Sequence, residues 1–328
     1  MDFDLTDVQK SWQQKGASLG QELAGDSSAA RVVTGASRVG LLDSEAELLA
    51  VALAVEAMAH ESSAAAVVFA LHCGIALTVA GDERFSSFFR GETVAAVALS
   101  SDEVPIEVGG RLSGRAAWVA PITDHGVAVV GPRRGQDRVA YAVALDGPGV
   151  TIEPVSTAAL EGLVCAHVTF SEAACTQIGA TLPFMTRIRV LMAAAGLGIG
   201  RRALHEALRT AKAAHTAAAG EQTVQGLLAD AATELDAAML MTWRAALDVG
   251  MPDIAPEQSL ADASLAKLAS TGAAQRAVLR ATQVVGADSF TQGHILERLA
   301  QDVRALELFA GRTEALREAA AEALLPRG

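Results

Sequence analysis

The sequence predicts an α+β protein in which a small β unit lies between two helical regions. Hydrophobic residues make up 51% of the 328 residues and aromatic residues only 4%, a composition that favours closely packed, alanine-rich helices. The apolar period changes from helical to alternating near Thr93 and back near Thr181. We therefore expect an N-terminal helical domain (1–93), a middle β-barrel or sandwich (94–178) and a C-terminal four-helix bundle (179–328).

The N-terminal region is expected to consist of helices at 4 to about 23 and at 43–80, the latter as one helix or two. Between them, RVVTGASRVG (31–40) lies in a stretch richer in Gly, Ser and Asp, which we interpret as a loop. The motif resembles the nucleotide loop of short-chain dehydrogenases. Those enzymes also need a Tyr-x-x-x-Lys pair, and the only tyrosine, Tyr141, is followed by AVAL. The motif is therefore a chance match.

The middle region has the pattern of short strands. Runs rich in Val and Ala, such as TVAAVALS and RVAYAVAL, are separated by Gly, Pro and Asp turns. Their spacing of about 8–12 residues is typical of an all-β unit. This pattern predicts the barrel or sandwich.

The C-terminal region has three long apolar-periodic segments and then a helix–glycine–helix unit at 295–325. Gly196, Gly198 and Gly200 form a GxGxG inside an apolar helix with no strand before it. Close contact between helices explains these glycines better than a dinucleotide-binding turn. Gly311 interrupts the last periodic segment, so a tight turn is expected there.

Charge and composition exclude several functions. The net charge of −12, without a stretch dense in Lys and Arg, argues against a nucleic-acid partner. Charged residues interrupt the longest apolar runs, so we expect no membrane span. Residues 1–5 have no basic segment followed by an apolar run, so we expect no secretory signal. The three cysteines, Cys73, Cys165 and Cys175, lack CxxC spacing and indicate reduced thiols in a cytoplasmic protein.

The C-terminal segment resembles a known signature. QVVGADSF followed by ERLAQDVRALELFAGRTEALR is similar to the C-terminal signature of acyl-CoA dehydrogenases, and helices, β unit, helices is also that family's order. The resemblance implies the acyl-CoA dehydrogenase fold and α,β-dehydrogenation of an acyl-CoA thioester. It also implies FAD as hydride acceptor and an electron-transfer flavoprotein or similar acceptor as a partner.

The resemblance leaves this chain without a catalytic base. The turn glutamate that takes the α-proton in the family is replaced by Ala310, and a methyl group cannot accept a proton. A second branch of the family carries its base at the position of Ile188, which is also apolar. Arg189 aligns with an arginine that contacts the CoA portion in relatives, so we expect it to bind substrate.

The positions that bind flavin in the family are only partly kept. The resemblance assigns cofactor contacts to Ser100, Trp118, Gln222, Gln283 and Gly286. The last three match segments that reach a neighbouring subunit's FAD in the family. Where the family has a threonine that hydrogen-bonds flavin N5, this chain has an alanine at position 120. We therefore expect FAD to be shared with, or held mainly by, a partner subunit.

Two functions fit this pattern. The first is a subunit of an α2β2 heterotetrameric acyl-CoA dehydrogenase, resembling those of actinobacterial steroid and cholesterol catabolism, in which a homologous partner supplies the base. The second is a non-catalytic scaffold or CoA-ester-binding protein that keeps the fold. A rearranged base, such as Asp288 or Glu307, is a third alternative that rests on spacing alone.

Overall fold

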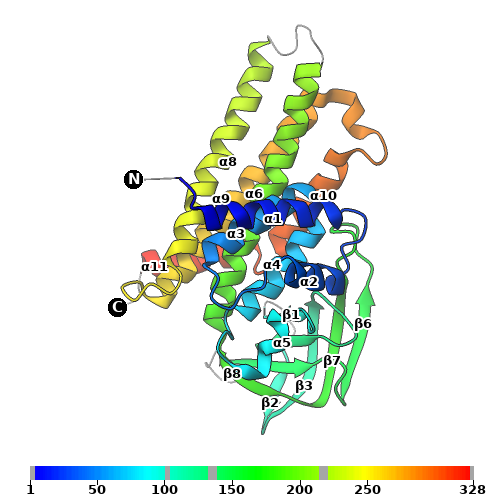
Figure 1. Ribbon diagram of the computed structural model, residues 1–328, viewed down its shortest axis with the longest axis vertical. Coiled ribbons are helices and arrows are strands. Elements are labelled where there is room, and N and C mark those ends of the chain that lie inside the picture. The colour runs from blue at the N-terminus through cyan, green and yellow to red at the C-terminus, as the bar shows by residue number, and fades with distance from the viewer. Residues whose placement is uncertain (1–3, 100–103, 132–138, 214–220, 326–328) are drawn as a thin grey trace.

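The computed structural model describes residues 4–99, 104–131, 139–213 and 221–325 (Figure 1). Helices form the upper part of the molecule in this view, and two sheets form the lower part. The order along the chain is helices, strands, helices, so the expected fold class is confirmed. The first strand begins at Ala95 and the first helix after the strands begins at Thr181, close to the two changes of period.

Among the N-terminal helices, α2 and α3 pack against α4, which is buried along its whole length, and α1 packs against α3. The helices of this region are α1 (Asp7–Glu22), α2 (Ala29–Arg38), α3 (Leu48–Glu61) and α4 (Ser63–Ala76), followed by the short η1 (Glu83–Phe85) and α5 (Ser86–Phe89). The segment 43–80 is thus two helices. Ser62 separates them with an extended backbone, and its hydroxyl accepts from the Ala65 N–H to cap α4.

The prediction of a loop at 31–40 is wrong, because most of this segment forms α2. Its glycine and hydroxyl residues suggested a turn, but Val32, Val33 and Ala36 fall on one face and are fully buried. Burial of this apolar face outweighs the weak helix propensity of a glycine and a threonine.

The β unit is a sandwich of two four-stranded sheets. One sheet has the order β1-β4-β5-β8, with β1 and β4 parallel, and the other has the order β2-β3-β7-β6 and is antiparallel. The strands are β1 (Ala95–Ala98), β2 (Ile106–Val108), β3 (Arg111–Val119), β4 (Val127–Val130), β5 (Val139–Ala144), β6 (Val150–Val155), β7 (Cys165–Ala174) and β8 (Thr176–Ala180). A separate apolar core fills the space between the sheets.

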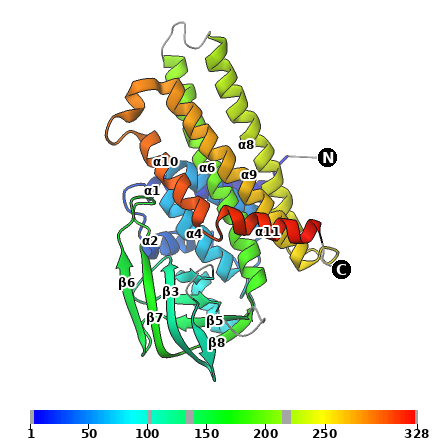
Figure 2. The ribbon, with the colours of Figure 1, turned by 180° about the vertical axis from the view of Figure 1, so that it is seen from behind.

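The C-terminal region is a bundle built on two long helices, α6 (Thr181–Ala213) and α9 (Pro256–Val285), which pack along each other. The remaining elements are α8 (Gln222–Asp248), η2 (Gly286–Phe290), α10 (Ile295–Leu308) and α11 (Thr313–Leu324). Figure 2 shows α10 and α11 on the back of the molecule, where both pack against α9 and α11 crosses it. The tight turn predicted at Gly311 joins them.

The three glycines of α6 lie where other elements approach its backbone. A Cβ on Gly196 would be 2.7 Å from the Ser270 hydroxyl, and one on Gly200 would be 3.0 Å from the Ala274 Cα. A Cβ on Gly198 would overlap the Glu56 carbonyl oxygen. Close helix contact, as predicted from the sequence, is therefore the reason for this GxGxG.

Two buried polar residues tie the helices to the sandwich. His72 on α4 accepts the Ala95 N–H at Nδ1 (3.1 Å) and donates from Nε2 to the Phe88 carbonyl (3.1 Å). Burial lowers the pKa of His72 to about 4, so the ring is neutral and has the Nε2–H tautomer. Asp302 on α10 accepts the Leu160 N–H at 2.7 Å. These contacts hold the three parts of the fold in register.

One described helix, α6, is long and apolar enough to cross a membrane, and 78% of its most apolar window is buried inside the protein. That burial is expected of a core helix. Among the described residues the cysteines are free, and burial raises the pKa of Cys165 to about 11. A structural role suits this thiol.

Candidate active site

The turn between α10 and α11 has a strained and buried backbone. Ala310 has a left-handed backbone with φ +58° and is only 3% exposed, and Gly311 follows with φ +111°. A non-glycine residue in this region is strained, so the surrounding contacts must hold it. The turn is therefore imposed by its neighbours.

Two buried cations hold the turn through its carbonyl oxygens. Arg189 on α6 donates from Nε to the Ala310 carbonyl at 3.1 Å and from Nη1 to the Ser264 hydroxyl at 2.8 Å. Lys267 on α9 donates from Nζ to the Gly311 carbonyl at 2.8 Å and to the Glu307 carbonyl at 3.2 Å. These bonds satisfy carbonyls at the C-terminus of α10, where positive charge is also favoured by the helix dipole.

Lys267 is fully buried, and its charge is correspondingly destabilised. Burial, followed by the nearby charge of Arg189, lowers the pKa of Lys267 to about 7, while Glu307 opposes the shift. The motifs and periodicity of the sequence do not single out this residue. The one indication in the sequence that Lys267 is buried is its position as the single cation in the apolar stretch ADASLAKLAS.

The carboxylate of Glu307, close to the turn in sequence, is already engaged in hydrogen bonds. Glu307 accepts hydrogen bonds from Thr313 Oγ1 and Gln275 Nε2, both at 2.8 Å. The bond from Thr313, with a smaller contribution from Gln275, lowers the pKa of Glu307. A carboxylate held in its ionised form this way is a weak base, which argues against Glu307 as a rearranged base.

The second expected base position is buried in hydrophobic contacts. Ile188 on α6 has no exposed surface and packs against α4, where a Cβ on Gly74 would be 2.5 Å from its Cγ1. Arg189, the next residue, is also buried and contacts Ala310. The structure thus brings Arg189 and Ala310 together, whereas a contact between Arg189 and CoA stays a prediction.

Trp118 lies on the sandwich with its side chain accessible. It has φ +57° at a β-bulge of β3, is 58% exposed and packs edge-on against His167 of β7. Ala120, two residues on, is buried, and its N–H and carbonyl both bond to Val97. The aromatic ring of Trp118 is therefore exposed to solvent. Ala120 has no side-chain hydrogen-bond donor, and its N–H is already bonded to Val97. Ser100 lies outside the described residues.

The other predicted cofactor positions lie far from the sandwich. Figure 1 shows the N-terminal end of α8 and the C-terminal end of α9 at the opposite end of the bundle from the sheets. Gln222 and Gln283 are exposed, and Gly286 has φ +75°. These residues therefore do not surround the same space as Trp118.

Gln283 borders a hollow of about 390 Å³ on α9 that also contains Arg276 and Arg280. Both arginines bond to Glu234, at 2.6 Å and 2.8 Å. The bond from Arg280 is the main reason that the pKa of Glu234 falls to about 2. Arg280 Nη2 also lies 3.8 Å from Asp230 Oδ2, so the two arginines of this hollow face two carboxylates of the same chain.

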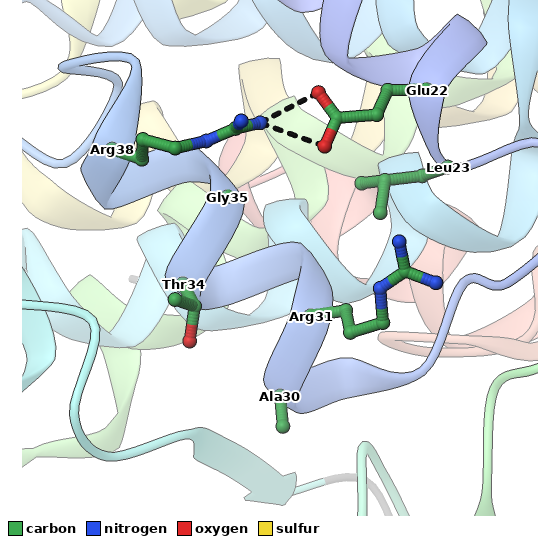
Figure 3. Close-up of a pocket in the computed structure, with 7 residues that line it drawn as sticks. All are labelled: Glu22, Leu23, Ala30, Arg31, Thr34, Gly35 and Arg38. Carbon is green, nitrogen blue, oxygen red and sulfur yellow. Dashed lines mark hydrogen bonds and ion pairs between the residues drawn. The ribbon is translucent and has the colours of Figure 1, made fainter.

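A second hollow, of about 300 Å³, lies between α1 and α2 (Figure 3). It is lined partly by the segment that resembles a nucleotide loop. Arg38 bonds to Glu22 at 2.6 Å, as Figure 3 shows, and Arg31 bonds to Asp26 at 2.7 Å. Helical backbone and paired arginines are not a phosphate-binding loop, so the rejection of that motif agrees with the geometry.

Comparisons with known proteins agree with this architecture. Residues 178–325 match the family model "Acyl-CoA dehydrogenase, C-terminal domain". The human mitochondrial short-chain specific acyl-CoA dehydrogenase is 26% identical over 313 residues, covering 82% of this chain and 74% of that protein. A Mycobacterium smegmatis glutaryl-CoA dehydrogenase in complex with FADH2 has the same fold, with a TM-score of 0.83 and 14% identity over 98% of this chain and 96% of that one.

In sequence the chain is thus similar to acyl-CoA dehydrogenases, and over nearly its whole length it has their fold. It is also similar to 3-(aryl)acrylate reductase of Clostridium sporogenes, with 33% identity over 131 residues. That match covers 38% of this chain and 33% of the reductase, so the chain matches about a third of that relative's length.

Within the acyl-CoA dehydrogenase fold, the missing base is the main departure. Ala310 occupies a turn held by Arg189 and Lys267, and its methyl side chain cannot accept a proton. Glu307, on the preceding helix, is hydrogen-bonded to Thr313 and Gln275. The roles assigned to Trp118 and Gln283 stay predictions.

Proposed function

We propose that this chain is a subunit of a heteromeric, FAD-dependent acyl-CoA dehydrogenase whose partner supplies the catalytic base. The single observation that carries the proposal is the Ala310 turn, which two buried cations hold in a strained conformation although it presents only a methyl group. A strained turn that is kept although it has no base is expected of a subunit that forms part of the site's structure. Another subunit would then perform the proton transfer.

The reaction would remove an α-proton and a β-hydride from an acyl-CoA thioester. FAD, when bound, supplies the hydride acceptor. At its own ring position the chain fits FAD poorly, because buried Ala120 has no side-chain donor and its backbone groups bond to Val97. The exposed amides of Gln222 and Gln283, at the far end of the bundle, fit better as contacts to a flavin held by another subunit.

The proposed assembly is an α2β2 heterotetramer with a homologous acyl-CoA dehydrogenase chain, in the cytoplasm. Exposed leucines on the C-terminal helices support an interface there, since Leu279, Leu308 and Leu324 are each more than 60% exposed. The substrate proposed is a bulky acyl-CoA such as a steroid side-chain ester. An electron-transfer flavoprotein or a similar protein would reoxidise the flavin.

Restoring the carboxylate alone should not restore activity. We expect Ala310→Glu to reduce a dye acceptor with acyl-CoA no faster than Ala310→Gln, which has the same size but no base. The reason is that Ala120 still leaves the flavin ring without its donor in this chain. Purified variants would be assayed with added FAD, and melting curves would verify folding.

Rapid, substrate-dependent dye reduction by Ala310→Glu but not by Ala310→Gln would contradict the proposal. Such a result would mean that this chain needs only a carboxylate at position 310 to catalyse the reaction by itself. A partner would then be unnecessary for flavin binding.

A further inference from the structure

A pair of histidines joins two helices outside the site described above. His60 lies in the last turn of α3, and His205 lies on α6, with His60 Nε2 and His205 Nδ1 3.4 Å apart. One turn earlier on both helices, Glu56 and Arg201 form an ion pair with 2.6 Å between Oε1 and Nε. The helix contact thus continues from an ion pair into two facing imidazoles.

The spacing of the two rings suits a shared metal ion. Two nitrogens bound to one tetrahedral Zn²⁺ at ~2.0–2.1 Å lie about 3.3 Å apart, with ring centres about 5 Å apart. Here the nitrogens are 3.4 Å apart and the ring centroids 5.4 Å apart. A hydrogen bond between the two nitrogens would usually be shorter, at about 2.9–3.0 Å.

Glu61 prepares His60 to be a ligand. Its Oε1 lies 2.8 Å from His60 Nδ1, so the neutral ring carries its proton on Nδ1 and directs the Nε2 lone pair toward His205. Carboxylates commonly orient metal-bound histidines in this way and raise their basicity. His205 is exposed, which gives solvent access to complete a coordination sphere.

We propose that His60 and His205 bind a divalent transition-metal cation, such as Zn²⁺, that bridges α3 and α6. Imidazole nitrogens favour Zn²⁺, Cu²⁺ and Ni²⁺ over Mg²⁺ and Ca²⁺. No group of three or more His, Cys, Asp or Glu ligands occurs among the described residues, so water completes the site. Glu61 acts as a positioning residue, and the bound cation joins the N-terminal helices to the C-terminal bundle.

The test uses the full chain, freed of any affinity tag and of metal. Calorimetric titration with ZnCl₂ should show one Zn²⁺ per chain, lost in both His60→Gln and His205→Gln. Glu61→Gln should weaken binding about tenfold, because the orienting carboxylate is removed. Zn²⁺ should also raise the melting temperature of the wild type but not of the two histidine variants.

His125→Gln is the matched control, because His125 is exposed on the sandwich and pairs with Asp146, away from α3 and α6. It should bind Zn²⁺ as the wild type does. Electron paramagnetic resonance of the Cu²⁺-loaded wild type should show coupling to two nitrogens. Zinc affinity unchanged in His60→Gln, or no uptake by the wild type at millimolar Zn²⁺, would overturn the proposal and leave a hydrogen-bonded histidine pair.

Discussion

Replacing Gly198 with alanine should destabilise the protein by about 3 kcal/mol, because the added methyl group has no space. A Cβ at this position overlaps the Glu56 carbonyl oxygen and lies 2.6 Å from the Ala59 side chain. A backbone oxygen cannot move aside as a flexible side chain can, so α3 and α6 must separate along their contact. Urea unfolding followed by circular dichroism measures the change.

Gly226→Ala is the matched control on α8. An added Cβ there meets nothing within 4 Å, and the position is exposed. Alanine is the better helix former by about 0.8–1 kcal/mol, so this variant should be slightly more stable than the wild type. Equal effects of the two substitutions would show that close packing at Gly198 does not hold the helices together.

The stability of the wild type should rise between pH 7 and pH 9 relative to Lys267→Met, by about 2–3 kcal/mol. The pKa of Lys267 is about 7 in the folded protein and about 10.4 in an unfolded chain. Between these values the unfolded state binds more protons, so stability increases with pH. Below pH 7 both states are protonated, and the cost of the buried charge is fully present.

The methionine variant removes the titrating group but keeps an unbranched apolar chain of similar length. Other groups that titrate in this range, such as thiols, are common to both proteins and cancel in the difference. Denaturant unfolding at several pH values gives the two curves. Parallel curves would mean that Lys267 keeps its normal pKa, and that its bonds to the Glu307 and Gly311 carbonyls are made without a desolvation cost.

The sequence predicted the architecture because apolar periodicity is long and clear in most elements. The glycines of α6 were interpreted correctly because no strand preceded them. The segment 31–40 was mistaken for a loop, since its Gly, Ser and Thr obscured an apolar face that only packing against neighbouring helices stabilises.

The candidate site was predictable only in part. Alignment to a signature identified Ala310 and Arg189, and the structure joins them through a hydrogen bond of 3.1 Å. Lys267 could not be predicted, because its burial depends on α9 meeting the α10–α11 turn, which is 40 or more residues away in sequence. The His60–His205 contact likewise joins helices separated by 145 residues.

The most direct test of the central claim is co-expression of this chain with the proteins encoded beside its gene. Size-exclusion chromatography and the visible spectrum of the eluted peak are the measurements. We expect a mixed tetramer with a flavin spectrum that oxidises an acyl-CoA, and loss of activity when the partner's base is replaced. A colourless homo-oligomer that binds none of these chains would contradict the account and favour a scaffold.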